Sequence, residues 1–114
     1  MVDELIQLLE TLDVPVIRQG SLAPEDEYPD TFITFWNNEE EGHSFYDNEE
    51  TSSTYDYDVN VYSQDPDTAY SLLDEARELL KAHDWIIYRR GHDVASDEIT
   101  HIGRGMEVIY FKED

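Results

Sequence analysis

The stretch from Thr51 to Tyr62 restricts the fold more than any other, because two kinds of side chain alternate along it. One series is aromatic or β-branched and the other is polar: Tyr55, Tyr57, Val59 and Val61 against Asp56, Asp58 and Asn60. Successive side chains of a β-strand point to opposite faces of the sheet. The stretch therefore predicts an antiparallel strand with one face on the core and the other in water.

The segment after this strand predicts an amphipathic helix. Asp65 is a good N-cap, and Pro66 stands at the first helical position, where a backbone N–H is not needed. Apolar residues then recur with helical spacing, at Ala69, Leu72, Leu73, Ala76, Leu79 and Leu80. A second helix is predicted from Asp3 to Leu12, and Pro15 follows it.

The remaining apolar runs predict strands on either side of these elements. They are Val16–Ile17, Thr31–Trp36, Trp85–Tyr88 and Gly105–Phe111. The order of helix, strands, helix and strands favours a single α+β domain over residues 1–114. We expect a mostly antiparallel sheet of four to five strands with two helices packed on one face.

Charge is distributed very unevenly along the chain, whose net charge is −21. Up to Ala76 there are 20 acidic residues and a single basic one, Arg18. Because nucleic-acid affinity depends on Lys and Arg neutralising phosphates, we expect no direct nucleic-acid binding. The acidic stretch Asn37–Glu50 predicts a hairpin loop or arm. Phe45 and Tyr46 lie in it without apolar neighbours, so we expect them to contact a neighbouring chain.

Composition also excludes several classes of protein. Cysteine is absent, which removes disulfides and thiolate zinc sites. No apolar run approaches the roughly 20 residues that span a bilayer. The start of the chain is acidic, unlike a signal peptide. We therefore expect a soluble protein without a membrane partner.

The polar stretch Gly91–Gly105 is predicted to be a long loop between the last two strands, and it gathers residue types found in active sites. His92, Asp93, Asp97 and His101 have metal-binding side chains, and Ser96 supplies a hydroxyl. No H-E-x-x-H, G-x-S-x-G or phosphate-binding loop accompanies them. The D-x-D-x-N pattern of residues 56–60 lacks the glycine and glutamate of an EF-hand. We expect no enzymatic activity, metal or cofactor.

The same stretch has a structural interpretation, which we prefer. Asp93, Ser96, Asp97 and Thr100 have side chains that bond to nearby backbone in polar turns. Arg104 would pair with one of these carboxylates. Together with His101, these residues would hold a fixed surface for a neighbouring subunit.

Three stretches taken together carry a family resemblance: residues 32–37 (FITFWN), 46–48 (YDN) and 93–104 (DVASDEITHIGR). The set resembles short proteins of the morphogenesis modules of tailed phages and prophages of Gram-positive bacteria. Ile99 stands where that pattern frequently has proline, and Ile102 stands where it has a small polar residue. The ordered set covers most of the chain, from about Phe32 onward.

The resemblance implies a minor structural protein of the tail or the head–tail junction. Such proteins are similar to tail terminators, which form a ring, often a hexamer, that caps the tail tube. It implies partners in other copies of the chain and in tail-tube or connector proteins, with assembly in the host bacterial cytoplasm and a final place in the virion. It brings no catalytic residues. The alternative is an acidic DNA mimic that occupies the nucleic-acid site of a host enzyme.

Overall fold

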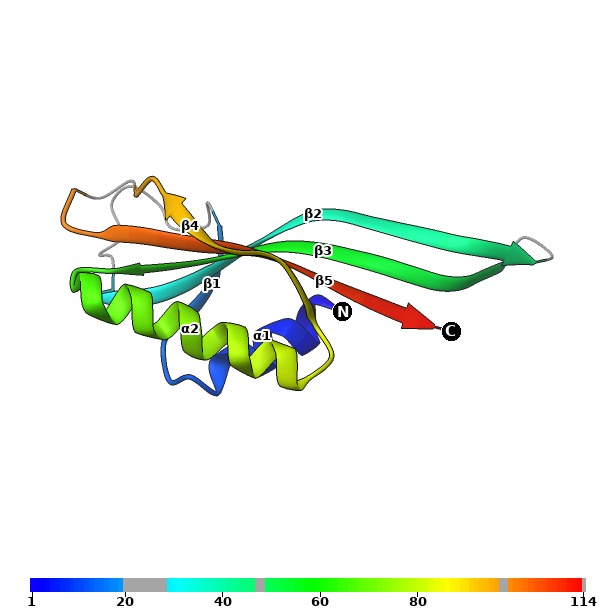
Figure 1. The fold of residues 1–114 in the computed structure, drawn as a ribbon, viewed down its shortest axis with the longest axis horizontal. Helices are drawn as coiled ribbons and strands as arrows, with labels where there is room; N and C mark the ends of the chain where they lie inside the picture. The colour runs from blue at the N-terminus through cyan, green and yellow to red at the C-terminus, as the bar shows by residue number, and fades with distance from the viewer. Residues whose placement is uncertain (20–28, 47–48, 97–98, 114) are drawn as a thin grey trace.

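The described residues form one five-stranded sheet, in the order β1-β2-β3-β5-β4, with both helices on one of its faces (Figure 1). The structure, a computed structural model, describes residues 1–19, 29–46, 49–96 and 99–113, and only the backbone of residues 40–46, 49–51 and 113. The elements are α1 (Val2–Glu10), β1 (Val16–Arg18), β2 (Thr31–Tyr46), β3 (Glu49–Ser63), α2 (Pro66–Ala82), β4 (Ile86–Val94) and β5 (Ile102–Glu113). The predicted α+β class is confirmed.

The core lies between the helices and the helix-facing side of the sheet. Three of the four predicted apolar residues of β3 are fully buried there, Tyr57, Val59 and Val61, and Tyr55 is partly buried. On the other face Asn60, predicted to lie in water, is buried as well. Leu5 and Leu9 of α1 cover the apolar residues of β3 together with the predicted apolar stripe of α2, except for Leu79, which is not among the buried residues of that helix. Burial of each large apolar side chain contributes about 1.5–3 kcal/mol, so this layer stabilises the contact between helices and sheet.

The N-terminus of α2 forms as predicted. The side chain of Asp65 accepts a hydrogen bond from the backbone N–H of Asp67 at 3.0 Å, and Pro66 opens the helix. The hydroxyl of Thr68 also donates to Asp65, at 3.1 Å. The cap therefore fixes where β3 ends and where α2 turns back across the sheet.

The pairing of β1 departs from the antiparallel pattern of the other strands. Its three residues pair in parallel with Ile33–Phe35 of β2. Every other strand pair in the described sheet is antiparallel. A strand this short carries no periodicity from which its direction follows, so the sequence predicts its existence but not its orientation.

The prediction of a loop over Gly91–Gly105 is wrong for most of these residues. β4 continues through Val94, β5 begins at Ile102, and the connection shrinks to residues 95–101. The cause is irregular pairing: the β4–β5 register shifts between Ile87 and Arg89, and again between Arg89 and His92. Such bulges break the alternation that marks a strand in a sequence, so the polar second half of β4 resembles a loop.

The acidic stretch predicted as a hairpin loop or arm consists largely of two paired strands. In Figure 1 the far ends of β2 and β3 project well beyond the helices, and the molecule is 53 Å long but only 29 and 22 Å in its other dimensions. We call residues 39–46 and 49–55 the acidic arm. A shift in register between Asn37 and Glu39 marks its root. Within the described residues, no helix is both long and apolar enough to cross a membrane.

Candidate functional site

The connection between β4 and β5 is anchored by a buried histidine. His101 is 6% exposed, and its Nε2 lies 2.8 Å from the carbonyl oxygen of Pro29. A carbonyl oxygen can accept a hydrogen bond but cannot donate one. Nε2 therefore carries the proton, and in the neutral ring Nδ1 accepts from the hydroxyl of Thr100 at 3.0 Å. The ring also packs edge-on against Phe32, which stacks on Tyr62 with centroids 5.1 Å apart. Both ring nitrogens are therefore engaged in hydrogen bonds within the protein.

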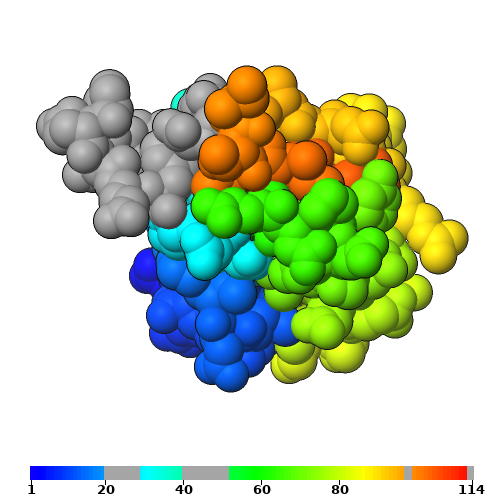
Figure 2. Space-filling model, turned by 90° about the vertical axis from the view of Figure 1, so that its left-hand side faces the viewer, coloured from blue at the N-terminus to red at the C-terminus, as the bar shows by residue number. Residues whose placement is uncertain are grey.

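This anchor fixes the end of the molecule opposite the arm. Figure 2 views that end, where the β4–β5 connection lies directly above the start of α2. Ser96 is partly buried in the connection, and Ile99 is fully exposed. Asp97 lies outside the described residues, so its predicted role in shaping the loop stays a prediction. Thr100, predicted to bond to backbone, instead contacts the neighbouring imidazole.

The predicted partner of Arg104 is Asp93, 2.8 Å from its Nη1. The two residues face each other on paired strands, since Asp93 of β4 is in register with Arg104 of β5. The guanidinium also lies over the ring of Tyr70 on α2, 4.6 Å from its centroid. A Cβ at Gly91 would lie 3.0 Å from this guanidinium, so glycine leaves room for the arginine to reach between sheet and helix. The pair joins β4, β5 and α2 and is not part of a loop.

The candidate metal ligands of the sequence do not converge. His92 lies in β4 opposite Gly105, whereas His101 is held at Pro29. In the parts of the chain that the structure describes, no three His, Asp or Glu side chains are grouped so as to hold a metal ion. Asp56, Asp58 and Asn60 lie along one strand and form no loop.

The sheet face that the helices leave open is acidic at its centre. Asp58 of β3 stands directly opposite Glu107 of β5. The amide of Asn38 donates to Asp58 at 2.9 Å and to Asp56 at 3.2 Å. Burial raises the pKa of Glu107 first of all; its hydrogen bond to Asp56 and the charges of Asp56 and Asp58 raise it further, while Arg89 lowers it. This face repels other anions.

Several apolar side chains of the predicted strands are exposed. Ile86 is 55% exposed and Tyr88 is 68% exposed, both on β4 at the edge of the sheet. Trp36, at 43%, lies beneath the guanidinium of Arg18 at 5.2 Å. Phe45 and Tyr46 pair through their backbones with Glu50 and Glu49 at the tip of the arm. Their side chains lie outside the described part of the chain, so their predicted contact with a neighbour stays a prediction.

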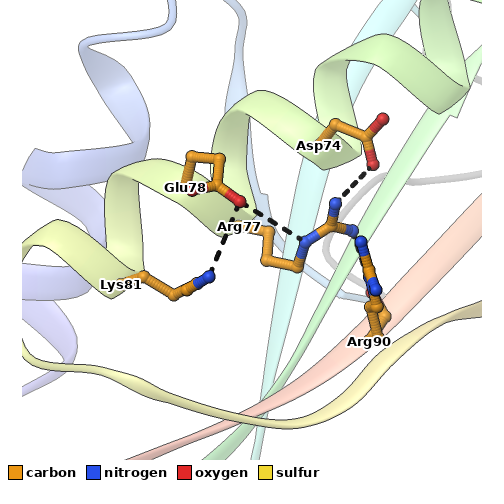
Figure 3. Close-up of polar contacts among 5 residues, drawn as sticks. All are labelled: Asp74, Arg77, Glu78, Lys81 and Arg90. Carbon is orange, nitrogen blue, oxygen red and sulfur yellow. Dashed lines mark hydrogen bonds and ion pairs between the residues drawn. The ribbon is translucent and has the colours of Figure 1, made fainter.

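A basic groove between α2 and β4 was missed by sequence reasoning. It is lined by Arg77, Glu78, Lys81, Trp85, Ile86, Ile87 and Arg90. Figure 3 shows its four charged residues together with Asp74. The signal of the groove in the sequence is the Arg89–Arg90 doublet, two adjacent cations in a chain with 28 acidic and only 7 basic residues. The groove contains three cations, whereas the sequence of the arm contains glutamates and no Lys or Arg.

Compared with known families and curated proteins, the chain matches no family model and no curated protein.

Proposed function

We propose that this protein is a structural subunit of a phage or prophage tail or head–tail junction, which acts like a tail terminator by self-associating as a ring. The observation that carries the proposal is the projecting acidic arm. It extends the sheet far beyond the helices that cover the rest of it (Figure 1). β5 pairs with the arm only at residues 52–55, so beyond Ser52 the arm consists of two strands. A two-stranded hairpin is marginally stable alone in water, so this outer part of the arm favours a role in which a neighbour covers it.

The surfaces described above support contacts between proteins more than chemistry. Of the two histidines considered as metal ligands, His101 is buried and has both ring nitrogens engaged. The exposed residues Ile86 and Tyr88 lie beside arginines, and aromatic and arginine side chains are enriched at protein interfaces. The arm and the edge strand β4 are different surfaces of one chain. Contacts between two different surfaces are heterologous, and they close into a ring when the rotation between subunits divides a full turn.

The proposal is tested by deleting the gene from the phage or prophage that carries it and imaging the induced particles by electron microscopy. We expect DNA-filled heads and separate tails, or tails of abnormal length, and restoration of normal virions when the gene is supplied from a plasmid. Normal virions in the deletion strain would overturn the proposal.

A second function, mimicry of DNA, is favoured by one observation. Asp56 and Asp58 are joined by Glu107 of the neighbouring strand, so carboxylates from two strands share the open face. The proton that Glu107 retains more readily lowers the charge of this face, which weakens a resemblance to fully ionised phosphates. A competition assay between the protein and labelled DNA for host nucleases tests this alternative. Displacement of the DNA would favour mimicry over ring assembly.

A further inference from the structure

We propose that the acidic arm of one copy of this chain docks in the basic groove between α2 and β4 of a second copy. The proposal rests on the proposed function for its setting, a ring of identical subunits, but it concerns a specific contact. The two surfaces in contact are the arm and the groove, and the attraction between the glutamates of the arm and the cations of the groove makes the contact specific.

The basic groove holds positive charge that its own neighbours leave incompletely balanced. Arg77 contacts Asp74 at 2.9 Å and Glu78 at 4.0 Å, and Lys81 reaches the same Glu78 at 3.8 Å. Arg90 forms no ion pair with any carboxylate of the described residues. Nη1 of Arg77 donates to the backbone carbonyl of Arg90 at 3.4 Å, which brings the two arginines together (Figure 3). Three cations of the groove therefore face two carboxylates, Asp74 and Glu78, which leaves one positive charge in excess.

Apolar surface lies beside this charge. Trp85 forms the buried floor at 4% exposure, whereas Ile86 is 55% exposed at the rim. Tyr88 continues the exposed apolar surface along β4. An interface typically combines apolar and aromatic contact with arginine, so the groove offers both contact area and selectivity.

The acidic arm fits this groove by charge. Its sequence holds five glutamates, Glu39, Glu40, Glu41, Glu49 and Glu50, and no Lys or Arg occurs between Arg18 and Arg77. The open face of the sheet is a poor alternative, because Asp56, Asp58 and Glu107 would oppose the glutamates of the arm. Like charges brought together at an interface cost several kcal/mol, so repulsion from one face adds to attraction by the other.

The edge of β4 indicates how the arm is held. The two register shifts in its pairing with β5 make this edge irregular, and Arg89 and Arg90 add charge to it. Bulges and charges at an edge oppose regular addition of another strand. The arm therefore docks through side chains and not by extending the sheet. Because each copy offers one arm and one groove, the contact runs from head to tail.

The test compares charge reversals by sedimentation equilibrium at 0.15 M salt, where the Debye length is about 8 Å and long-range repulsion between chains is largely screened. Arg90→Glu reverses the unpaired cation of the groove, and we expect the association constant to fall at least about tenfold. Arg18→Glu makes the same change in net charge at an exposed position on β1, at the opposite edge of the sheet from β4 and outside the arm. It should leave the association constant unchanged.

The reciprocal variant Glu39→Lys/Glu40→Lys changes two consecutive positions, which covers both faces of the strand. It lowers the net negative charge and so reduces general repulsion, yet we expect it to weaken association. Combining it with Arg90→Glu in one chain restores opposite charges across the contact and should recover the association constant. Circular dichroism and melting temperature establish that each variant is folded.

Three outcomes would overturn the docking: equal losses from Arg90→Glu and Arg18→Glu, no recovery in the combined variant, or a wild-type chain that stays monomeric at all concentrations. None of them decides the proposed function, which is tested by the deletion strain. Normal virions in that strain together with recovery in the combined variant would leave the docking in place and remove the phage role.

Discussion

Replacing Glu107 by glutamine should stabilise the protein at neutral pH. Glu107 lies opposite Asp58 and hydrogen-bonds to Asp56, while Arg89 offsets part of the repulsion. An unfavourable cross-strand charge pair costs about 0.2–1 kcal/mol, and an exposed ion pair contributes about as much in the opposite sense. Removing two repulsions and one attraction leaves a net gain of about 0.2–1 kcal/mol. At about 4 °C per kcal/mol for a domain of this size, the melting temperature should rise by about 1–4 °C.

The gain should depend on pH in a defined direction. The pKa of Glu107 in the folded protein is raised above its ordinary value of 4.5, so the folded state binds this proton more tightly than the unfolded state does. The stability that the group contributes is fully present below pH 4.5 and is lost as the pH rises through the raised pKa. The amide of glutamine stays neutral and donates to Asp56 at every pH. The advantage of the variant should therefore be largest near pH 7.5 and small below pH 4.5.

Thermal melts of wild type and variant between pH 4 and 8 measure this difference, and Glu75→Gln serves as the matched control. Glu75 is exposed on α2, so its replacement removes one charge without relieving the cluster on the open face. Equal effects of the two glutamine variants would mean that relief of total charge explains the gain. An advantage of Glu107→Gln that stays constant across this range would refute the raised pKa.

Two further predictions concern the fold. Asp65→Ala removes the hydrogen bond to the backbone of Asp67 at 3.0 Å and should lower the unfolding free energy in urea by about 1 kcal/mol; an unchanged value would mean that the cap is dispensable. Gly103→Ala would place a Cβ 2.7 Å from the carbonyl oxygen of Val94 and should cost about 1–3 kcal/mol in thermal melts. At Gly91 the added Cβ would approach only the end of a flexible arginine, at 3.0 Å, and Leu73 at 3.4 Å, so Gly91→Ala should cost less; equal losses would contradict this reasoning.

The elements predicted most accurately are those whose signals are local. β3 is apparent from its alternation and α2 from its cap and apolar spacing, since neither depends on a distant part of the chain. The sequence predicts β4 only as far as Tyr88, because two bulges remove the alternation of side chains beyond that residue. The parallel pairing of β1 depends on where the chain returns at Ile33, which no local pattern specifies.

In the candidate site, too, local features could be predicted from the sequence and contacts between distant residues could not. The pairing of Arg104 with a carboxylate was predictable because only Asp and Glu can neutralise a partly buried arginine, but its place on paired strands was not. The basic groove depends on α2 crossing the sheet so that Arg77 meets Arg90, 13 residues away in sequence. The sequence spacing of Arg77 and Arg90 does not predict that they contact each other.

The negative charge of the arm allows it to stay exposed before assembly without pairing indiscriminately with other strands. An arm meant to bind a neighbour must stay exposed before assembly, yet an exposed hairpin with a free edge is a template for indiscriminate pairing. β1 pairs with β2 only through Ile33–Phe35, so the rest of that edge has no strand beside it in the described residues. Glutamates repel a second arm and the acidic open face alike. Specificity is a difference between affinities, so a surface that rejects most of the molecule needs only modest attraction from one groove to select it.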